Sequence, residues 1–495
     1  MTTKATNYKS IFKATSIFGG VQVFNILITL IRGKAVAILI GTAGMGLNGL
    51  FLAGLNLIKS ISSLGIAESA VRDISKAHAT QDAAQISKTF TVFRRWIWIT
   101  AVLGILFTIG FSPLLSHFSF KSYTHTTDYI WLSITLIFGA LTGGIYTLLR
   151  GTRQIKYLAQ ANIYGGIIGL LVSLHIFYFY GIKGVVPAII ITAFANYLIS
   201  LYFRKHIHFA PTIIDWKETL ELGKPMVKLG ISLTLINLLA AFVAFVLSAY
   251  ISQSGSLSDV GLYNAGLAIV DGYVGMVFTA MATDYFPRLS AVIGDDSKWK
   301  QLVNEQAELV LIILGIVLVL LISTTPLLIR ILLSKEFLSA QGFIFWAVLS
   351  IPFKGLVWVL GFVLLAKGDN KLFLIVEVTS NMLLLGFNLL FYKIYGINGL
   401  GISILISYSI FIIVMLTILK QKYAFIFSND VFILLTKGMI SLSLCLISIY
   451  CLGYPKAYFA ESIVVIITIS YCMFELNKRM NIKEIILNLK SKFIS

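Results

Sequence analysis

Residues 340–366 have the sequence AQGFIFWAVLSIPFKGLVWVLGFVLLA, and this stretch decides the fold. A helix of about 20 mostly apolar residues crosses the hydrocarbon core of a bilayer, and here a single charge, Lys354, stands at the middle of such a helix. Lys354 is about 13 residues, or roughly 20 Å, from either end, too deep for its ammonium group to reach the interface easily. Two residues earlier, Pro352 removes a backbone donor and favours a kink that opens a polar pocket. We therefore predict a membrane-spanning helix with a functional lysine at its centre.

The composition extends this prediction to the whole chain. Of 495 residues, 58% are hydrophobic and 12% are charged, about half the charged fraction of a soluble domain. The net charge of +18 does not indicate a nucleic-acid partner, because the basic residues are spread over short loops instead of gathering in one patch. We predict an all-α polytopic membrane protein.

Fourteen stretches are long and apolar enough to span a membrane. They are residues 14–40, 46–66, 94–115, 129–149, 158–179, 184–203, 229–252, 260–283, 308–333, 340–366, 372–395, 398–420, 430–453 and 459–474. With both termini in the cytoplasm, 29 Lys and Arg residues fall on the cytoplasmic side and five on the other, as the positive-inside rule requires. The segments near 67–93, 204–228 and 284–307, and the basic tail at 482–493, are expected to form surface helices. The first stretch also resembles a signal peptide with a cleavage site at Ala35-Val36-Ala37, but we interpret it as a retained span, because thirteen more follow and it carries charged candidates.

An internal repeat organises these spans. Residues 49–59 resemble 261–271, residues 112–115 resemble 325–328, and residues 180–184 resemble 395–399, with Arg150-Gly151 similar to Lys367-Gly368, at offsets of 212 to 217. Six spans separate equivalent positions, so the two copies have the same orientation, and parallel repeats of this kind bind substrate between their halves. We predict an N-lobe of six helices at 1–209, a C-lobe of six helices at 210–422, and two extra helices with a basic tail at 423–495.

We single out seven charged side chains that lie inside the predicted spans. They are Arg32, Lys34, Lys59, Arg330 and Lys354, which are cationic, and Asp271 and Glu377, which are anionic. Facing lipid, seven such charges would cost roughly 20 kcal/mol, so they are expected to line a polar interior. Because cations outnumber anions, that interior should bind an anion.

Helix geometry indicates which of these charges share a face. In the first span, Gln22, Asn25 and Thr29 fall on the face of Arg32, whereas Lys34 lies about 200° away unless Gly33 loosens the helix. In the eleventh span, Ser380, Asn381 and Asn388 share the face of Glu377.

Several of these residues have a structural alternative. Arg330 can anchor its helix at the interface, and Lys59 can extend to the headgroups. Asp271 and Glu377 can simply neutralise a lysine, or can carry a coupling cation. Lys59 and Asp271 occupy equivalent repeat positions, so we also consider that they pair.

Enzymatic signatures are missing from the sequence. It contains no phosphate-binding Gly-rich loop, no HExxH, no G-x-S-x-G and no His/Cys set with metal spacing. Cys445, Cys451 and Cys472 all lie in the last two spans and suit small core residues. We predict no catalytic residue, no metal and no cofactor.

Four diffuse motifs resemble a known family. They are residues 34–47, Asp271-Gly-Tyr with the later Pro287-Arg-Leu-Ser290, residues 346–367 around Lys354, and residues 373–378 around Glu377. With them, residues 10–420 resemble the O-antigen and enterobacterial-common-antigen type flippases, of the polysaccharide-transport branch of the multidrug/oligosaccharidyl-lipid/polysaccharide exporter superfamily. The resemblance implies roles for Lys34, Asp271, Lys354 and Glu377, so it favours Lys34 where the helical wheel favours Arg32. Both stay candidates.

The resemblance also implies a function. The substrate would be an undecaprenyl-pyrophosphate-linked oligosaccharide that crosses the bacterial inner membrane by alternating access, with polysaccharide polymerase and chain-length proteins as possible partners beside membrane lipids. One alternative is a cation-coupled multidrug exporter, which the cationic interior disfavours. A membrane polymerase, which would need larger external loops, and a scaffold for polysaccharide assembly are the others.

Overall fold

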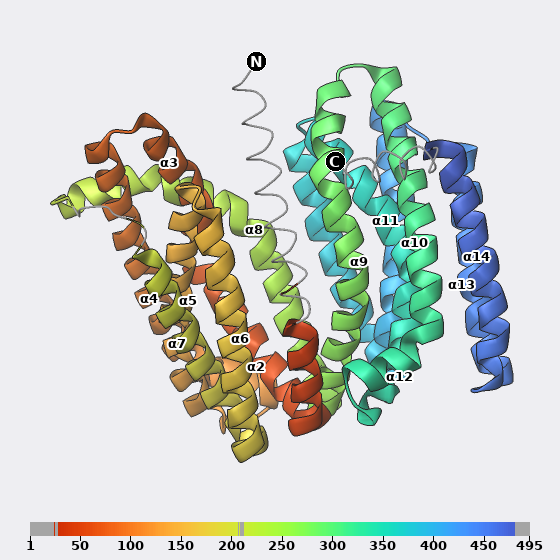
Figure 1. Cartoon of the computed structure of the whole chain (residues 1–495), viewed down its shortest axis with the longest axis horizontal. Helices are drawn as coiled ribbons and strands as arrows, with labels where there is room; N and C mark the ends of the chain where they lie inside the picture. Colours follow the sequence, from red (N-terminus) through yellow and green to blue (C-terminus); the bar gives the residue numbers. More distant parts are fainter. Residues whose placement is uncertain (1–23, 25–27, 206, 208–211, 481–495) are drawn as a thin grey trace, which may run out of the picture. The chain divides into compact units, whose positions relative to one another are not determined.

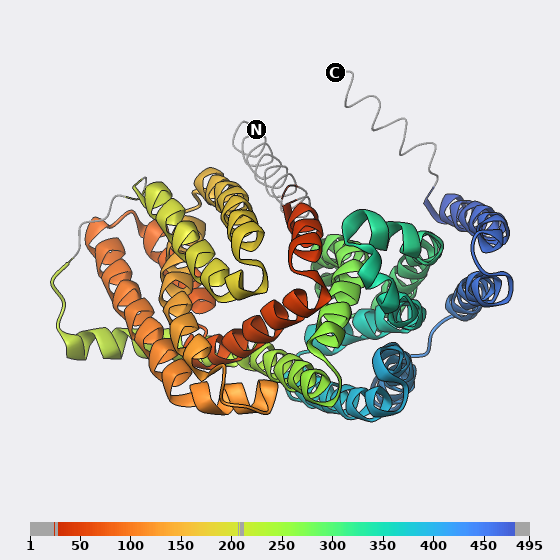
Figure 2. The same ribbon diagram turned by 90° about the horizontal axis from the view of Figure 1, so that it is seen from below.

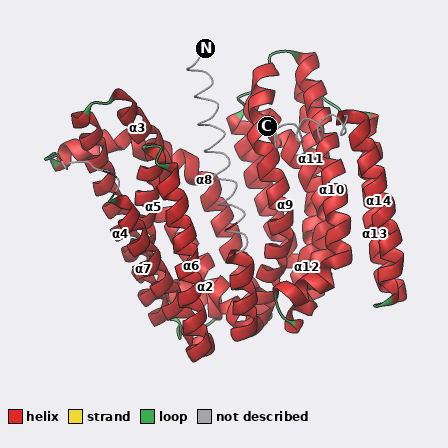
Figure 3. Ribbon diagram, in the orientation of Figure 1, coloured by secondary structure: helices red, strands yellow, loops and turns green. Residues whose placement is uncertain are grey.

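The computed structural model describes residues 24, 28–205, 207 and 212–480, apart from the side chains of Leu233 and Met480. Every regular element in these ranges is a helix, as Figure 3 shows. A helix at 28–39 comes first. The elements that follow are α2 (Gly41–Ser62), α3 (Ile66–Thr80), α4 (Ala83–Phe120), α5 (Thr126–Gly151), α6 (Ile155–Tyr180), η1 (Gly181–Gly184), α7 (Val185–Arg204), α8 (Trp216–Ser254), α9 (Leu257–Val292), α10 (Asp296–Leu332), η2 (Lys335–Ala340), α11 (Gln341–Ala366), α12 (Asn370–Tyr423), α13 (Asn429–Leu452) and α14 (Lys456–Met480).

The predicted set of membrane spans agrees with these helices. Eleven stretches of the described chain are long and apolar enough to cross a membrane. Two of them hold two spans each, because η1 divides residues 155–204 and Gly396 leaves helical geometry inside α12. The span predicted at 14–40 is described only in part, at its end. The all-α architecture of about fourteen spans is therefore confirmed, and the protein is a multi-pass membrane protein.

The described chain forms two compact units, which we call unit 1 (residues 1–261 and 332–334) and unit 2 (residues 262–331 and 335–495). In unit 1, α2 packs against α4, α5, α7 and α8. Phe51 and Tyr129, both fully buried, meet edge to face at the centre of this packing, with ring centroids 5.2 Å apart. Unit 1 includes α8, although the repeat assigns α8 to the second copy. Units defined by packing and copies defined by the repeat need not coincide. The predicted lobe borders at 1–209, 210–422 and 423–495 therefore stay a proposal.

In unit 2, α11 is the central helix. It packs against α12 and α13, and its span is the most extensively buried of the eleven. Its apolar side chains on several faces, among them Phe343, Val348 and Leu360, are fully buried. A helix that is apolar all round is typical of the core of a membrane bundle. Figure 2 shows α13 and α14, in blue, side by side as a helical pair.

The backbone supports the internal repeat. Gly181 (φ 53°, ψ −134°) and Gly396 (φ 58°, ψ −141°) adopt the same conformation 215 residues apart, in a region that is essentially restricted to glycine. The ends of α5 and α11 match at the same offset. Gln154 N donates to Leu149 O at 2.8 Å and Asp369 N to Leu364 O at 3.0 Å, the six-to-one bond of a Schellman cap.

The surface segments follow the expectations only in part. A separate helix, α3, does connect α2 and α4, as the amphipathic stretch near 67–93 predicts. The expectation of a surface helix at 284–307 is wrong, because α9 continues to Val292 and α10 starts at Asp296. Between them Asp295 caps the next helix and pairs with Lys298 at 2.9 Å, and its hydrogen bonds to Lys298 lower the pKa of the Asp295 carboxyl. The tail helix predicted at 482–493 lies outside the described residues.

Candidate functional site

The strongest candidate site lies around Lys354, near the middle of α11. Its Nζ is 3.4 Å from Oδ1 of Asp271 on α9. It also lies 6.0 Å from the ring centroid of Tyr408 on the second half of α12, within the range of a cation–π interaction. The Lys354 side chain is 33% exposed and that of Asp271 is 58% exposed. The pair is therefore accessible and not sealed in the core.

A cavity of about 270 Å³ adjoins this pair within unit 2. Its polar lining includes Lys354, Glu377, Ser380 and Asn381. Because Glu377, Ser380 and Asn381 line the same cavity, the prediction that they share one face of α12 is confirmed. Aromatic side chains supply much of the rest, namely Phe278, Trp358, Phe362, Phe373, Tyr408 and Phe411. A few polar groups set among aromatic and apolar walls are typical of a small-molecule site.

The site around Lys354 has no excess of positive charge, because it holds one cation, Lys354, and two anions, Asp271 and Glu377. Lys354 is paired with Asp271, and the Glu377 carboxylate has no hydrogen bond or ion pair among the described residues. Asn388, predicted on the face of Glu377, is buried elsewhere and accepts a hydrogen bond from Ser403 across the Gly396 turn. The cationic excess predicted for the interior thus depends on the N-terminal candidates, which belong to the other unit.

Arg32 and Lys34 lie on the short helix at 28–39 of unit 1, and both are half-buried. Within the described ranges, Arg32 makes no hydrogen bond or ion pair. Gln22 and Asn25, predicted to share its face, are outside those ranges. The choice between Arg32 and Lys34 therefore stays open, and both stay proposed site residues.

Lys59 and Arg330 each lie near a helix end. Lys59 is exposed in the last turn of α2, and Arg330 is exposed in the last turn of α10. These places suit side chains that extend to the headgroups. Asp271 has its ion pair with Lys354, inside unit 2, and a pairing of Lys59 with Asp271 stays a prediction.

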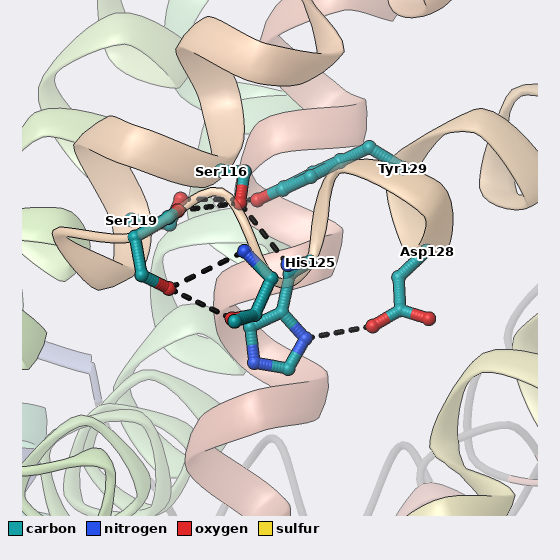
Figure 4. Close-up of polar contacts among 7 residues, drawn as sticks. Ser116, Ser119, His125, Asp128 and Tyr129 are labelled. Carbon is teal, nitrogen blue, oxygen red and sulfur yellow. Dashed lines mark hydrogen bonds and ion pairs between the residues drawn. The ribbon is translucent and has the colours of Figure 1, made fainter.

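Figure 4 shows a polar cluster between α4 and α5 that the sequence did not single out. His125 Nδ1 lies 2.7 Å from Oδ2 of Asp128, and Ser116 and Ser119 are neighbours. Catalysis by a serine, histidine and aspartate needs the serine hydroxyl on the other ring nitrogen. Here Ser116 Oγ donates to Ser122 O at 2.7 Å and accepts from the backbone N of His125, while Ser119 Oγ bonds the Tyr129 hydroxyl at 3.0 Å. The cluster joins two helix ends and is not arranged for nucleophilic attack.

Two charged groups on α14 were also missed. Arg479 binds Glu308 of α10 through Nε at 2.6 Å, and its Nη1 bonds the Glu475 carboxylate. Glu461, in contrast, is 1% exposed, and neither carboxylate oxygen has a hydrogen-bond partner. Glu461 lies inside the span predicted at 459–474 and could have been counted there. Arg479 lies beyond the end of that span, although α14 continues to Met480.

Comparison with known proteins identifies the family. A family model described as "Polysaccharide biosynthesis protein" matches residues 35–342, well over half of the chain. The chain belongs to this polysaccharide biosynthesis protein family. The match covers all of α2 to α10 and ends at the start of α11, so it includes Asp271 and Lys59 but not Lys354.

Two curated relatives of this family member have a stated function. The chain is 20% identical over 398 residues to proteins of Escherichia coli (strain K12) and Shigella flexneri, each named "Lipid III flippase". The aligned region is 77% of this chain and 91% of each relative.

Solved structures show the same fold. A structure of the lipid II flippase MurJ in an inward closed conformation aligns with a TM-score of 0.64, 16% identity, and 93% and 98% of the two chains covered. An inward-facing multidrug resistance MATE family transporter of the MOP superfamily aligns with a TM-score of 0.60, 16% identity, and 81% and 94% covered. This family member therefore has the fold of MOP superfamily transporters, which is common to flippases and drug exporters.

Proposed function

We propose that the protein is a flippase for a polyprenyl-diphosphate-linked oligosaccharide, such as an O-antigen repeat unit. It would act by alternating access in a bacterial cytoplasmic membrane, with both termini in the cytoplasm and without catalysis or a cofactor. The observation that carries this proposal is Lys354, held near mid-helix beside a cavity with polar and aromatic walls. The family description and the function named for its curated relatives support a lipid-linked saccharide.

The chemistry of the cavity suits the head of such a lipid. A diphosphate would bind the Lys354 ammonium, because a hydrogen bond to a charged group is stronger than one between neutral groups. Sugar hydroxyls would bind Ser380, Asn381 and Glu377, and the amphipathic rings of Trp358 and Tyr408 would contact the sugar faces. Arg32 and Lys34 are proposed as further substrate-binding residues on the basis of the sequence, and Lys59 and Arg330 as weaker ones because they lie near helix ends.

Asp271 would compete with the substrate. Its carboxylate already occupies one side of Lys354 Nζ, so a diphosphate must displace it or share the ammonium group. Glu377 adds a second negative charge to the same cavity. A proton or sodium ion bound at Glu377 would remove that repulsion, which makes Glu377 the proposed coupling residue. Binding of the cation and of the anionic head would then strengthen each other.

A leaflet-transfer assay tests the function. The purified protein is reconstituted into vesicles with a fluorescent polyprenyl-diphosphate oligosaccharide, and transfer is measured by its protection from a membrane-impermeant quencher. Lys354→Ala should slow transfer at least tenfold, since a hydrogen bond to a charged group contributes about 1.5–3 kcal/mol. Lys393→Ala is the matched control, because Lys393 is exposed on α12 and does not line the cavity.

Two results would contradict the proposal. One is unchanged transfer by both Lys354→Ala and Arg32→Ala. The other is wild-type protein that exports a cationic dye down an imposed ion gradient but does not transfer the lipid, which would favour a drug exporter, since MATE transporters have the same fold. A role together with polysaccharide polymerase and chain-length proteins would show as co-purification with them.

A further inference from the structure

A second cavity, of about 660 Å³, lies in unit 1 and shares no lining residue with the cavity beside Lys354. Its walls are formed by α4, α5 and α7, and the start of α8 closes one end. Three arginines line it, Arg94 and Arg95 from α4 and Arg204 from the last turn of α7. No acidic side chain of the described chain lines it. A cavity of this kind can hold an anion.

The three arginines differ in what they already bind. Arg95 Nη1 donates to Thr219 Oγ1 at 2.6 Å, and its guanidinium lies 4.8 Å from the centroid of the Trp216 ring. Arg95 thus holds the start of α8 in place. Arg94 and Arg204 make no hydrogen bond or ion pair with any described residue. As far as the described residues go, two of the three guanidinium groups therefore have donors available for a ligand.

The frame around these arginines is fixed by further contacts between α4 and α8. Lys88 pairs with Glu218 at 2.5 Å, and Trp96 Nε1 donates to Thr219 O at 3.2 Å. Asp215 caps α8 by accepting from Trp216 N at 2.7 Å. Figure 1 shows this first part of α8, in yellow-green, lying across the helices of unit 1 before the chain turns into the span that follows.

The opposite part of the cavity is apolar and open to the side. This part of the cavity is lined by Trp98 and Val102, which belong to the spanning part of α4. Each of the two side chains is 48% exposed. Exposed apolar side chains of such a span are able to contact lipid chains. An occupant that contacts both the arginines and this wall must have an anionic head and a hydrocarbon chain.

We propose that this cavity binds an anionic glycerophospholipid, with its phosphate on Arg94 and Arg204 and an acyl chain along Trp98 and Val102. The volume is within the 300–1,000 Å³ typical of ligand sites. Basic pockets between membrane helices bind anionic lipid headgroups through the same chemistry. Sequence topology places these arginines on the cytoplasmic side. The site is independent of the transport function proposed above.

Native mass spectrometry of the full-length protein in detergent tests this site. Phosphatidylglycerol and phosphatidylcholine with identical acyl chains are titrated separately, and the bound fraction of each is measured. The double variant Arg94→Ala/Arg204→Ala should bind phosphatidylglycerol about thirty-fold more weakly, which corresponds to about 1 kcal/mol for each arginine near the surface. Binding of phosphatidylcholine should not change. Arg150→Ala/Lys156→Ala is the matched control, since both side chains are exposed and do not line the cavity.

A second measurement locates the bound lipid. Phosphatidylglycerol with brominated chains should quench tryptophan fluorescence, and Trp98→Phe should remove much of that quenching while binding by mass spectrometry persists. Unchanged binding in the double arginine variant would overturn the proposal, as would an equal loss of both lipids. Displacement by inorganic phosphate would show a headgroup site without a lipid requirement. Displacement by a polyprenyl diphosphate at a lower concentration than phosphatidylglycerol would assign the cavity to the transported lipid instead.

Discussion

Replacement of Asp271 by asparagine should tighten the binding of an anionic substrate. Asp271 Oδ1 lies 3.4 Å from Lys354 Nζ, and at an effective dielectric constant of 20 that attraction is about 5 kcal/mol. Water reduces it, because the two side chains are 58% and 33% exposed, and fully exposed pairs contribute at most about 1 kcal/mol. We therefore expect Asp271→Asn to strengthen the interaction of Lys354 with the anionic substrate by about 1–2 kcal/mol, which is a five- to thirty-fold decrease in the Kd of that substrate.

The assay for this effect is equilibrium binding of a fluorescent polyprenyl-diphosphate oligosaccharide to the purified protein. Asp271→Asn is compared with wild type in two backgrounds, one with Lys354 and one with Lys354→Met. The gain in affinity should disappear in the Lys354→Met background, because Asp271 then has no lysine to release. Asp284→Asn is the control on the same helix, since Asp284 pairs with Arg288 and does not line the cavity.

The competition between Asp271 and substrate would be refuted in either of two ways. Asp271→Asn could bind the lipid as weakly as wild type, or more weakly, while Lys354→Met still reduces binding. Alternatively, the effects of the two substitutions could add within about 0.5 kcal/mol, as independent sites do. Either result would leave Asp271 as a structural partner of Lys354 only.

Three further substitutions test the packing of unit 2 by thermal unfolding in detergent. Arg479→Met should lower the free energy of unfolding by about 2–3 kcal/mol, a value between those of surface ion pairs and fully buried ones. The substitution leaves the carboxylates of Glu308 and Glu475 without their ion pair, at 14% and 13% exposure. Adding Glu308→Gln should recover part of this loss, and no recovery would contradict the ion-pair account. Glu461→Met should raise the unfolding temperature, because it removes two buried oxygens without partners among the described residues at a gain of about 1–3 kcal/mol. An equal or lower unfolding temperature would contradict this account of Glu461. Gly396→Ala should cost about 1–3 kcal/mol at its positive φ, whereas Gly386→Ala, on the helical part of α12 with open space around it, should be neutral or stabilising.

The spans could be predicted from the sequence because a membrane helix is decided locally. Length and hydrophobicity suffice, since every backbone polar group is satisfied inside the helix itself. The depth of Lys354 and the shared face of Glu377, Ser380 and Asn381 follow from the same local geometry, and the structure confirms the shared face. The turns at Gly181 and Gly396 could be located by comparing the chain with itself, although only the structure gives their conformation.

What the sequence could not supply are contacts between helices distant in the chain. Repeat symmetry suggested a pairing of Lys59 with Asp271, which stays a prediction, but it gave no indication of the ion pair between Asp271 and Lys354, from two helices of the same unit. Asn388 has the correct helical phase for the cavity, yet packing turns it towards Ser403. A helical wheel contains no information about which neighbour a face meets, so partners of this kind require coordinates.

In the transport cycle proposed above, the ion pair would explain how Lys354 can both bind and release an anionic head. A lone ammonium group in mid-membrane is costly, and Asp271 offsets that cost while the site is empty. The same carboxylate weakens the hold on an anionic head, because the head gains only the difference between its own attraction for Lys354 and that of Asp271. A transporter needs a site that binds well enough to select its substrate and weakly enough to release it. An internal counter-ion within reach of Lys354 meets both requirements, whereas an unpaired cluster of cations would favour retention of a diphosphate.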